Sequence, residues 1–280
     1  EAILTVKNGI YLVNLNGNQL PRTLIKRNDR EKEKSWVKEL NITDAGINKT
    51  EEIRHNFIIL KTKTEDGQKR GFLRLDLKEN KIDSLSMEHV YFNSSIKKAK
   101  IANVYLLTKE RSDNYPNLFI TRDFRKYSEI SDLHPERKFN WMQTEMYKWT
   151  YKQESFYGVL YKPENFDTSK RYPIIFFYYP DEALEVNEFM PPKIIGGSIN
   201  IPYFVSNGYL VFQPFIKAKK GIPGESAMVP VISASKYLKQ FAWIDSTRMG
   251  LHGHSMGGFE TNYIITHSNR FRAAISCAGI

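Results

Sequence analysis

The six residues Gly253-His254-Ser255-Met256-Gly257-Gly258 constrain the fold of this chain more than any other feature. They fit the pattern G-x-S-x-G, in which a serine occupies a sharp turn between a strand and a helix. The run 248–254 predicts the strand, and a helix is predicted from about Gly257. We predict that the turn exposes the Ser255 hydroxyl as a nucleophile. The N–H groups at the start of the helix would lie where negative charge develops during acyl transfer, and they would stabilise it.

The chain around this turn alternates between predicted strands and predicted helices, which is typical of a parallel α/β sheet. Continuous apolar runs favour strands that are covered on both faces. The predicted strands are 157–161, 174–179, 210–213, 248–254 and 273–277, the last with Cys277 as an inert core thiol. A short helix is predicted at 201–206, stopped by Asn207-Gly208, and another is predicted to begin near Pro230, with Val231, Ala234 and Leu238 on its apolar face.

The first half of the chain has a different pattern, with polar and apolar residues alternating as in strands that have one solvated face. The residues before position 141 include 47 charged side chains, and those after it include 25. Alternation occurs in 11–17, with a turn at Asn16-Gly17, and recurs in 71–81 and 117–126. The spacing suits the blades of a β-propeller, although a β-sandwich would give a similar pattern. We therefore predict a partial β-propeller over 1–138 and an α/β domain over 139–280.

Composition excludes several classes of function. The net charge is +10 in 280 residues, with +7 before position 141 and +3 after it. Because the positive charge is spread along the chain and not clustered in one basic patch, we expect no nucleic-acid binding. No apolar run approaches the roughly 20 residues of a membrane span. With one cysteine, Cys277, we expect neither a metal site nor a bound cofactor. The sequence is compatible with a periplasmic or secreted protein and with a cytoplasmic one. It is also compatible with both a monomer and a homo-oligomer.

A nucleophilic serine needs a base, and the sequence does not supply one in a suitable place. His267 would lie roughly 18 Å along the predicted helix from Ser255. His252 and His254 share one strand face and are expected to point into a packed layer. Asp245 would lie at the opposite end of the strand that leads to Ser255. Because the acid and histidine of α/β-hydrolases follow the serine in chain order, the triad is not completed within this chain.

Several segments resemble one known family. They are 138–167, 171–180, 206–214, 221–226, 243–261 and 271–279. The chain is similar over these residues to the middle portion of prolyl oligopeptidase family serine peptidases, on the dipeptidyl-peptidase or acylaminoacyl-peptidase side. The resemblance implies a propeller followed by an α/β-hydrolase, with peptides as substrates. It also implies that the chain is a fragment, inactive alone, whose catalytic Asp and His lie beyond Ile280.

The resemblance also implies roles for individual residues. Ser255 would be the nucleophile, the backbone N–H of Met256 would be one oxyanion donor, and the hydroxyl of Tyr179 would be the other. Chemistry alone does not separate Tyr179 from its neighbour Tyr178, since both are tyrosines at the end of a predicted strand. Phe215 stands where many relatives have Asp, and this difference concerns the shape of the pocket.

Two other functions compete with the peptidase. A carboxylesterase would have the same fold and the same nucleophilic serine. Esterases, however, seldom carry a propeller-like domain that precedes the hydrolase domain in the chain. A non-catalytic binding protein on a decayed hydrolase scaffold would explain the missing base. The glycines around Ser255 are intact, which argues against loss of catalytic activity, because a non-catalytic protein would not need to keep them.

Overall fold

The computed structural model describes residues 2–6, 9–13, 20–26, 41–42, 57–64, 67–93, 96–182, 184–193 and 198–279. The chain divides into two compact units. Unit 1 comprises Glu1–Glu110 and Pro116–Leu133, and unit 2 comprises Arg111–Tyr115 and His134–Ile280. Each unit is described separately below. The sequence-based domain boundary between residues 138 and 139 stays a prediction.

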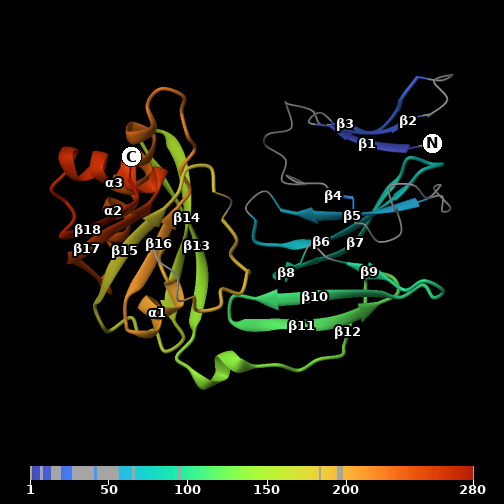
Figure 1. Cartoon of the computed structure of the whole chain (residues 1–280), viewed down its shortest axis with the longest axis horizontal. Coiled ribbons are helices and arrows are strands. Elements are labelled where there is room, and N and C mark those ends of the chain that lie inside the picture. Colours follow the sequence, from blue (N-terminus) through green and yellow to red (C-terminus); the bar gives the residue numbers. More distant parts are fainter. Residues whose placement is uncertain are drawn as a thin grey trace. The chain divides into compact units, whose positions relative to one another are not determined.

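The described strands of unit 1 form antiparallel sheets that follow one another along the chain (Figure 1). The first sheet contains β1 (Ala2–Val6), β2 (Gly9–Val13) and β3 (Arg22–Lys26). The second contains β4 (Asn41–Ile42), β5 (Phe57–Lys63), β6 (Arg70–Asp76) and β7 (Ile82–Glu88). The third contains β8 (Tyr91–Phe92), β9 (Lys97–Lys98), β10 (Tyr105–Arg111), β11 (Asn114–Thr121) and β12 (Ser128–Glu129).

An aromatic cluster forms the centre of unit 1. The ring of Phe72 on β6 lies 5.0 Å from that of Phe92 and 4.7 Å from that of Phe124. Leu75, also on β6, is fully buried, as the alternation in 71–81 predicted. The turn predicted at Asn16-Gly17 lies outside the described residues.

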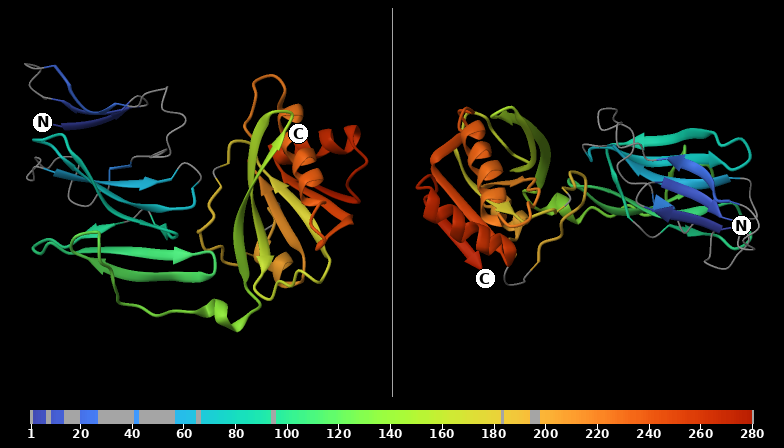
Figure 2. Two further views of the ribbon diagram at one scale, coloured as in Figure 1. Left: turned by 180° about the vertical axis from the view of Figure 1, so that it is seen from behind. Right: turned by 90° about the horizontal axis from the view of Figure 1, so that it is seen from above.

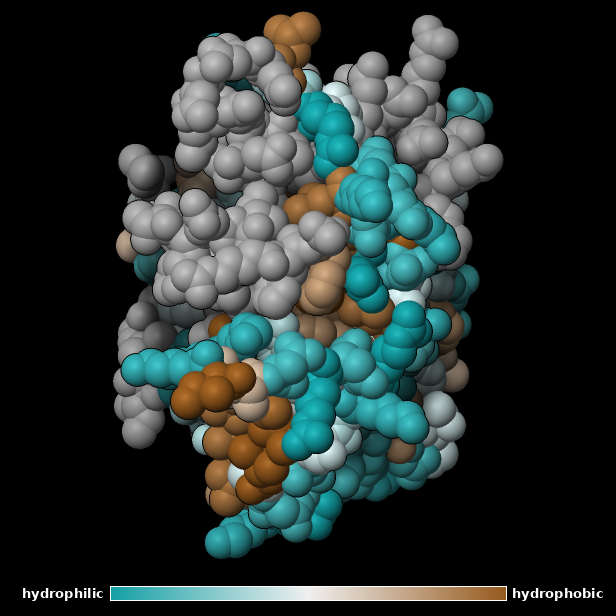
Figure 3. Space-filling view, turned by 90° about the vertical axis from the view of Figure 1, so that its right-hand side faces the viewer, coloured by the Kyte–Doolittle hydropathy of each residue, from teal (hydrophilic) through white to brown (hydrophobic). Residues whose placement is uncertain are grey.

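The surface of unit 1 mixes charges of both signs. Lys109 pairs with Glu88, and the ammonium group of Lys81 lies 3.7 Å from the carboxylate of Asp83. Where the face in Figure 3 is coloured, hydrophilic groups predominate, and hydrophobic groups gather in a patch at its lower left. The positive charge is therefore accompanied by acidic neighbours.

Unit 2 contains a six-stranded sheet in the order β13-β14-β16-β15-β17-β18. Its strands are β13 (Met142–Tyr151), β14 (Glu154–Pro163), β15 (Tyr172–Tyr178), β16 (Leu210–Pro214), β17 (Ile244–His254) and β18 (Ala273–Cys277). A 3₁₀ turn at Pro135–Lys138 precedes them. The four strands β16, β15, β17 and β18 run parallel, as predicted, whereas the β13–β14 hairpin adds an antiparallel edge.

Helices cover both faces of this sheet. Helix α1 (Ile201–Ser206) packs on one face, and α2 (Pro223–Leu238) and α3 (Met256–His267) pack on the other. Figure 2 shows α2 in orange and α3 in red on the same side of the sheet. The end of α1 at Asn207 is followed by Gly208 with a φ of 82°, as the sequence predicted. No helix in the described ranges is both long and apolar enough to cross a membrane.

Two details of the sequence-based prediction are wrong. Helix α2 begins at Pro223, so Pro230 lies inside the helix instead of starting it. The predicted apolar stripe is nevertheless buried, because the period of 3.6 residues is independent of where the helix begins. Strand β18 exists but is largely exposed, because it is the edge of the described sheet, and Cys277 is only half-buried.

A buried tryptophan of the β13–β14 hairpin packs against helix α2. The indole N–H of Trp149 donates a hydrogen bond of 2.9 Å to the hydroxyl of Ser233. The indole also stacks on Phe156 of the hairpin and on Tyr237 of α2. Tyr147 of the same strand also packs on Tyr237, so several aromatic contacts join the antiparallel hairpin to this helix.

We predict that Trp149→Phe in the full-length protein lowers the free energy of unfolding by about 1–2 kcal/mol, because Ser233 loses its buried partner. The measurement is a urea unfolding midpoint. Combining Trp149→Phe with Ser233→Ala completes a double-mutant cycle, in which a coupling energy near zero would contradict the role of this hydrogen bond.

Candidate active site

Ser255 lies in a strained turn between β17 and α3. Its backbone has φ 54° and ψ −119°, a combination that residues other than glycine rarely adopt. Its N–H donates to the carbonyl oxygen of Cys277 at 2.8 Å, and its own carbonyl accepts from the N–H of Phe259 at 3.1 Å. These bonds fix the turn on both sides, and the serine remains only half-buried.

Glycines around the turn allow backbone segments to touch directly. A Cβ at position 253 would lie 2.0 Å from the carbonyl oxygen of Gly257, and a Cβ at 257 would lie 2.5 Å from that of Tyr178. A Cβ at 258 would lie 2.8 Å from the carbonyl oxygen of Cys277. The first turn of α3 therefore packs on the ends of β15 and β18 with no side chain in between.

The structure separates the two tyrosines that the sequence left open. Tyr178 is fully buried, and its hydroxyl donates to the hydroxyl of Thr261 at 2.8 Å, which in turn donates to the carbonyl of Gly257 at 2.8 Å. Burial also raises the pKa of Tyr178. Tyr179, one residue beyond the strand, is 41% exposed. Tyr178 is thus committed to the interior, and Tyr179 is the tyrosine whose side chain reaches solvent at this strand end.

Met256 is the first residue of α3. The first N–H groups of a helix have no acceptor within the helix, and they point out of its positive end. Register in the sheet pairs Tyr178 with Gly253, so Tyr179 follows at the level where the chain turns into Ser255. A half-buried hydroxyl beside helix N–H groups is an arrangement suited to acyl transfer.

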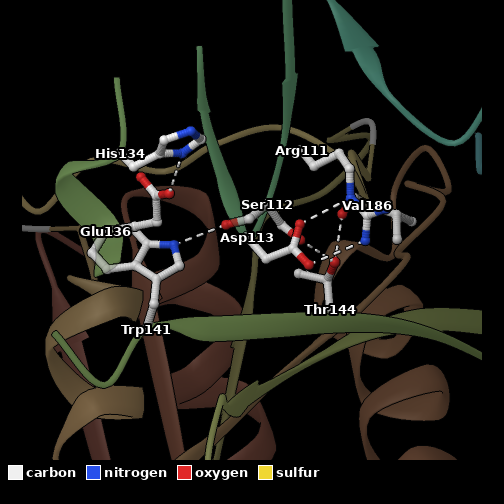
Figure 4. Close-up of polar contacts among 8 residues, drawn as sticks. All are labelled: Arg111, Ser112, Asp113, His134, Glu136, Trp141, Thr144 and Val186. Atoms are coloured by element: carbon white, nitrogen blue, oxygen red, sulfur yellow. Dashed lines mark hydrogen bonds and ion pairs between the residues drawn. The ribbon is translucent and has the colours of Figure 1, made fainter. Parts of the chain in front are cut away.

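The loop that follows β15 is held by hydrogen bonds within unit 2 (Figure 4). The hydroxyl of Thr144 on β13 donates to the carbonyl of Val186 at 2.5 Å and lies 2.7 Å from the hydroxyl of Ser112. The indole N–H of Trp141 donates to the carbonyl of Ser112 at 2.9 Å, and the Trp141 ring stacks on Phe189. The loop after Tyr179 is therefore anchored at 186–189.

The acids of this loop are engaged locally. Asp181 accepts a hydrogen bond from the N–H of Ala218 at 3.1 Å. Glu182 accepts one from the side-chain amide of Gln213 at 2.9 Å, and burial raises the pKa of Glu182. Tyr161 donates to the amide oxygen of Gln213 at 3.0 Å. These contacts connect the strand end to β14 and β16 beneath the loop.

The histidines lie where the sequence analysis placed them, away from the serine hydroxyl. His267 is the last residue of α3, stacks on Tyr263 and contacts the Tyr263 carbonyl at 2.8 Å through its Nδ1. His252 is buried next to Phe177, and burial lowers the pKa of its ring. Asp245, at the far end of β17, bonds Arg248. Within the described part of the chain, no histidine makes a hydrogen bond to Ser255.

One residue near Ser255 was missed by the sequence analysis. Glu260, on α3, has no exposed surface, and within the described ranges neither carboxylate oxygen has a hydrogen-bond partner. Burial raises its pKa to about 8, and the charge of Asp181 raises it as well. A signal existed in the sequence, because Glu260 lies on the same helix face as Gly257 and Ile264.

Metal binding has no support in the described ranges, where no group of three or more His, Cys, Asp or Glu side chains could hold an ion.

The fold and the strained serine turn together define an α/β protein with a candidate nucleophile, and comparisons with known proteins show its relatives. Residues 201–280 match the prolyl oligopeptidase family. The chain is 28% identical over 168 residues to dipeptidyl-peptidase 5 of Porphyromonas endodontalis, covering 55% of this chain and 22% of the relative. It is 30% identical over 139 residues to dipeptidyl peptidase 8 of Mus musculus, covering 44% of this chain and 15% of the relative. The predicted resemblance to the prolyl oligopeptidase family is thereby confirmed.

Solved structures share the fold over almost the whole chain. Porphyromonas gingivalis dipeptidyl peptidase 4 superposes with a TM-score of 0.68 at 18% identity, covering 97% of this chain and 38% of that one. The acylaminoacyl peptidase of Pyrococcus horikoshii gives a TM-score of 0.65 at 14% identity, covering 97% and 40%. The chain therefore spans about two fifths of these structures, and 22% and 15% of the two relatives above.

We predict that Gly253→Ala in the full-length protein lowers the free energy of unfolding by at least about 3 kcal/mol, because the new Cβ would overlap the backbone of Gly257. Gly250→Ala is a matched control on the same strand, since its Cβ would lie 3.5 Å from the nearest atom, the carbonyl oxygen of Ala273. It should change stability by less than about 1 kcal/mol. Equal shifts in the thermal midpoints of the two variants would contradict the packing described for the turn.

Proposed function

We propose that the protein to which this chain belongs is a serine peptidase of the prolyl oligopeptidase type, with Ser255 as its nucleophile. The observation that carries the proposal is the strained turn at Ser255, which glycines on either side allow to pack on two strand ends. In this proposal residues 1–138 are part of a β-propeller, and residues 139–280 are the first part of an α/β-hydrolase domain. The successive antiparallel sheets of unit 1 support the propeller.

The proposed reaction begins with attack of the Ser255 hydroxyl oxygen on the carbonyl carbon of a peptide bond. The N–H of Met256 and the hydroxyl of Tyr179 stabilise the negative charge that develops on the carbonyl oxygen. The amine leaves with a proton, and water then hydrolyses the acyl-serine ester. Both proton transfers require a histidine base oriented by an acid, which the described residues do not place beside Ser255.

The substrate is proposed to be a peptide rather than a carboxylic ester. Relatives of this chain are named as dipeptidyl peptidases and solved neighbours as dipeptidyl and acylaminoacyl peptidases. The β unit that precedes the α/β unit in the chain also favours a peptidase, because esterases seldom carry a propeller-like domain.

We expect a fluorophosphonate probe to add one adduct to the full-length protein and to add none to the Ser255→Ala variant. The measurement is intact mass combined with peptide mapping of the adduct. Turnover of a peptide amide separates the peptidase from an esterase, which would hydrolyse only short-chain esters. A folded wild-type protein without an adduct would contradict the proposed nucleophile.

The two tyrosines should respond differently to removal of the hydroxyl group. Tyr179→Phe should lower kcat by about 10²-fold with little change in stability, because it removes an oxyanion donor from an exposed position. Tyr178→Phe should instead lower the free energy of unfolding by about 1–2 kcal/mol, because the Thr261 hydroxyl loses its buried donor. A loss of kcat only in Tyr178→Phe would reverse the assignment.

A further inference from the structure

Glu260 is a buried carboxyl group that the proposed reaction does not use. It follows Ser255 by five residues, and none of its surface is exposed. Both carboxylate oxygens are buried, and neither has a hydrogen-bond partner among the residues that the structure describes. Buried polar groups in proteins are almost always hydrogen-bonded, and a buried charge without a partner costs several kcal/mol. The interior around Glu260 therefore favours the neutral carboxylic acid.

Among the described residues, the groups coupled to Glu260 offer it no positive charge. Asp181, in the loop after β15, is electrostatically coupled to Glu260 with the same sign of charge. Tyr178, at the end of β15, is also coupled to it, and the charge of Glu260 raises the pKa of the Tyr178 hydroxyl. On β17, His252 packs against Phe177 on the opposite face of the sheet. Glu225 in the first turn of α2 is exposed.

Ionisation of Glu260 would create repulsion with Asp181, and these two residues belong to the segments that carry the proposed oxyanion donors. Glu260 is fixed to α3, whose first residue is Met256. Asp181 lies two residues after Tyr179 and is held by the N–H of Ala218. A second negative charge at Glu260 would therefore push the Tyr179 segment and the start of α3 apart, although the backbones of these segments are in direct contact at Gly257.

We propose that Glu260 is a positioning residue: its neutral carboxyl group lets the two segments that carry the oxyanion donors stay packed together, and its ionisation at alkaline pH weakens the site. This inference rests on the proposed function, because it concerns the reactivity of Ser255. It adds a loss of Ser255 reactivity at alkaline pH, which the nucleophile and its oxyanion donors do not themselves explain. The pKa of about 8 places the transition within the range in which the enzyme can be assayed.

The test is the rate constant of fluorophosphonate labelling of Ser255 in the full-length protein between pH 6 and pH 10. In the wild type it should fall about tenfold between pH 7 and pH 9, as expected for loss of a neutral group with a pKa near 8. Glu260→Gln should change by less than about twofold over the same range. Glu225→Gln, the same substitution at an exposed carboxylate, should keep the wild-type profile.

A second variant provides an independent test if Glu260→Gln does not fold. Glu260→Met has similar length and no titratable group, and it should also lose the alkaline fall. Thermal unfolding provides a readout that does not depend on labelling. Because the folded state holds the proton up to about pH 8 and the unfolded state releases it near 4.5, the wild type should lose stability relative to Glu260→Met as pH rises between these values.

The outcomes separate the inference from the proposed function. Labelling of Ser255 with parallel pH profiles in the wild type, Glu260→Gln and Glu260→Met would overturn the role of Glu260 and leave the nucleophile intact. A stability difference independent of pH would overturn it as well, since Glu260 would then titrate at its ordinary value. Absence of labelling in the folded wild type at every pH would overturn both the proposed function and the inference that rests on it.

Discussion

Direct contact between backbones at the start of helix α3 is the constraint on which the rest of the site depends. The first turn of this helix touches the carbonyl ends of β15 and β18, and only glycine fits at Gly253, Gly257 and Gly258. That contact holds Ser255 in a conformation that costs free energy. It also places the free N–H groups of the helix beside the strand end that leads into Tyr179. The nucleophile and both proposed oxyanion donors thus share one packing contact.

The same contact explains why two adjacent tyrosines have different surroundings. Successive side chains of a strand point to opposite faces, so Tyr178 enters the layer between β15 and α3 whereas Tyr179 leaves the strand toward solvent. The layer that receives Tyr178 also encloses Glu260. Close packing therefore has two effects here: it orders the turn around Ser255, and it buries a carboxyl group that would be more stable in water.

Several failures of sequence reasoning have a common physical cause. Pro230 was taken as the start of α2, although Pro223 begins the helix, because proline marks a first turn only when the preceding chain is not already helical. Strand β18 was expected to be buried from its apolar residues, but burial depends on neighbours across the sheet, and β18 is the described edge. Glu260 shares a helix face with buried residues, but a glutamate in a helix is ordinarily solvated, and only the packed structure shows that this one is buried. Each of these features depends on neighbours that lie far away in the chain.

The sequence by itself determined the α/β character of the second half of the chain, the β-strands of the first half and the position of the serine turn. These follow from periodicity and from glycine spacing, which are local properties of a few neighbouring residues. Only the tertiary structure decided which tyrosine faces solvent, that the loop after β15 is anchored through Thr144, and that Glu260 is buried without a partner. Those features depend on segments far apart in the chain, whose contacts form only when the sheet and its helices pack together.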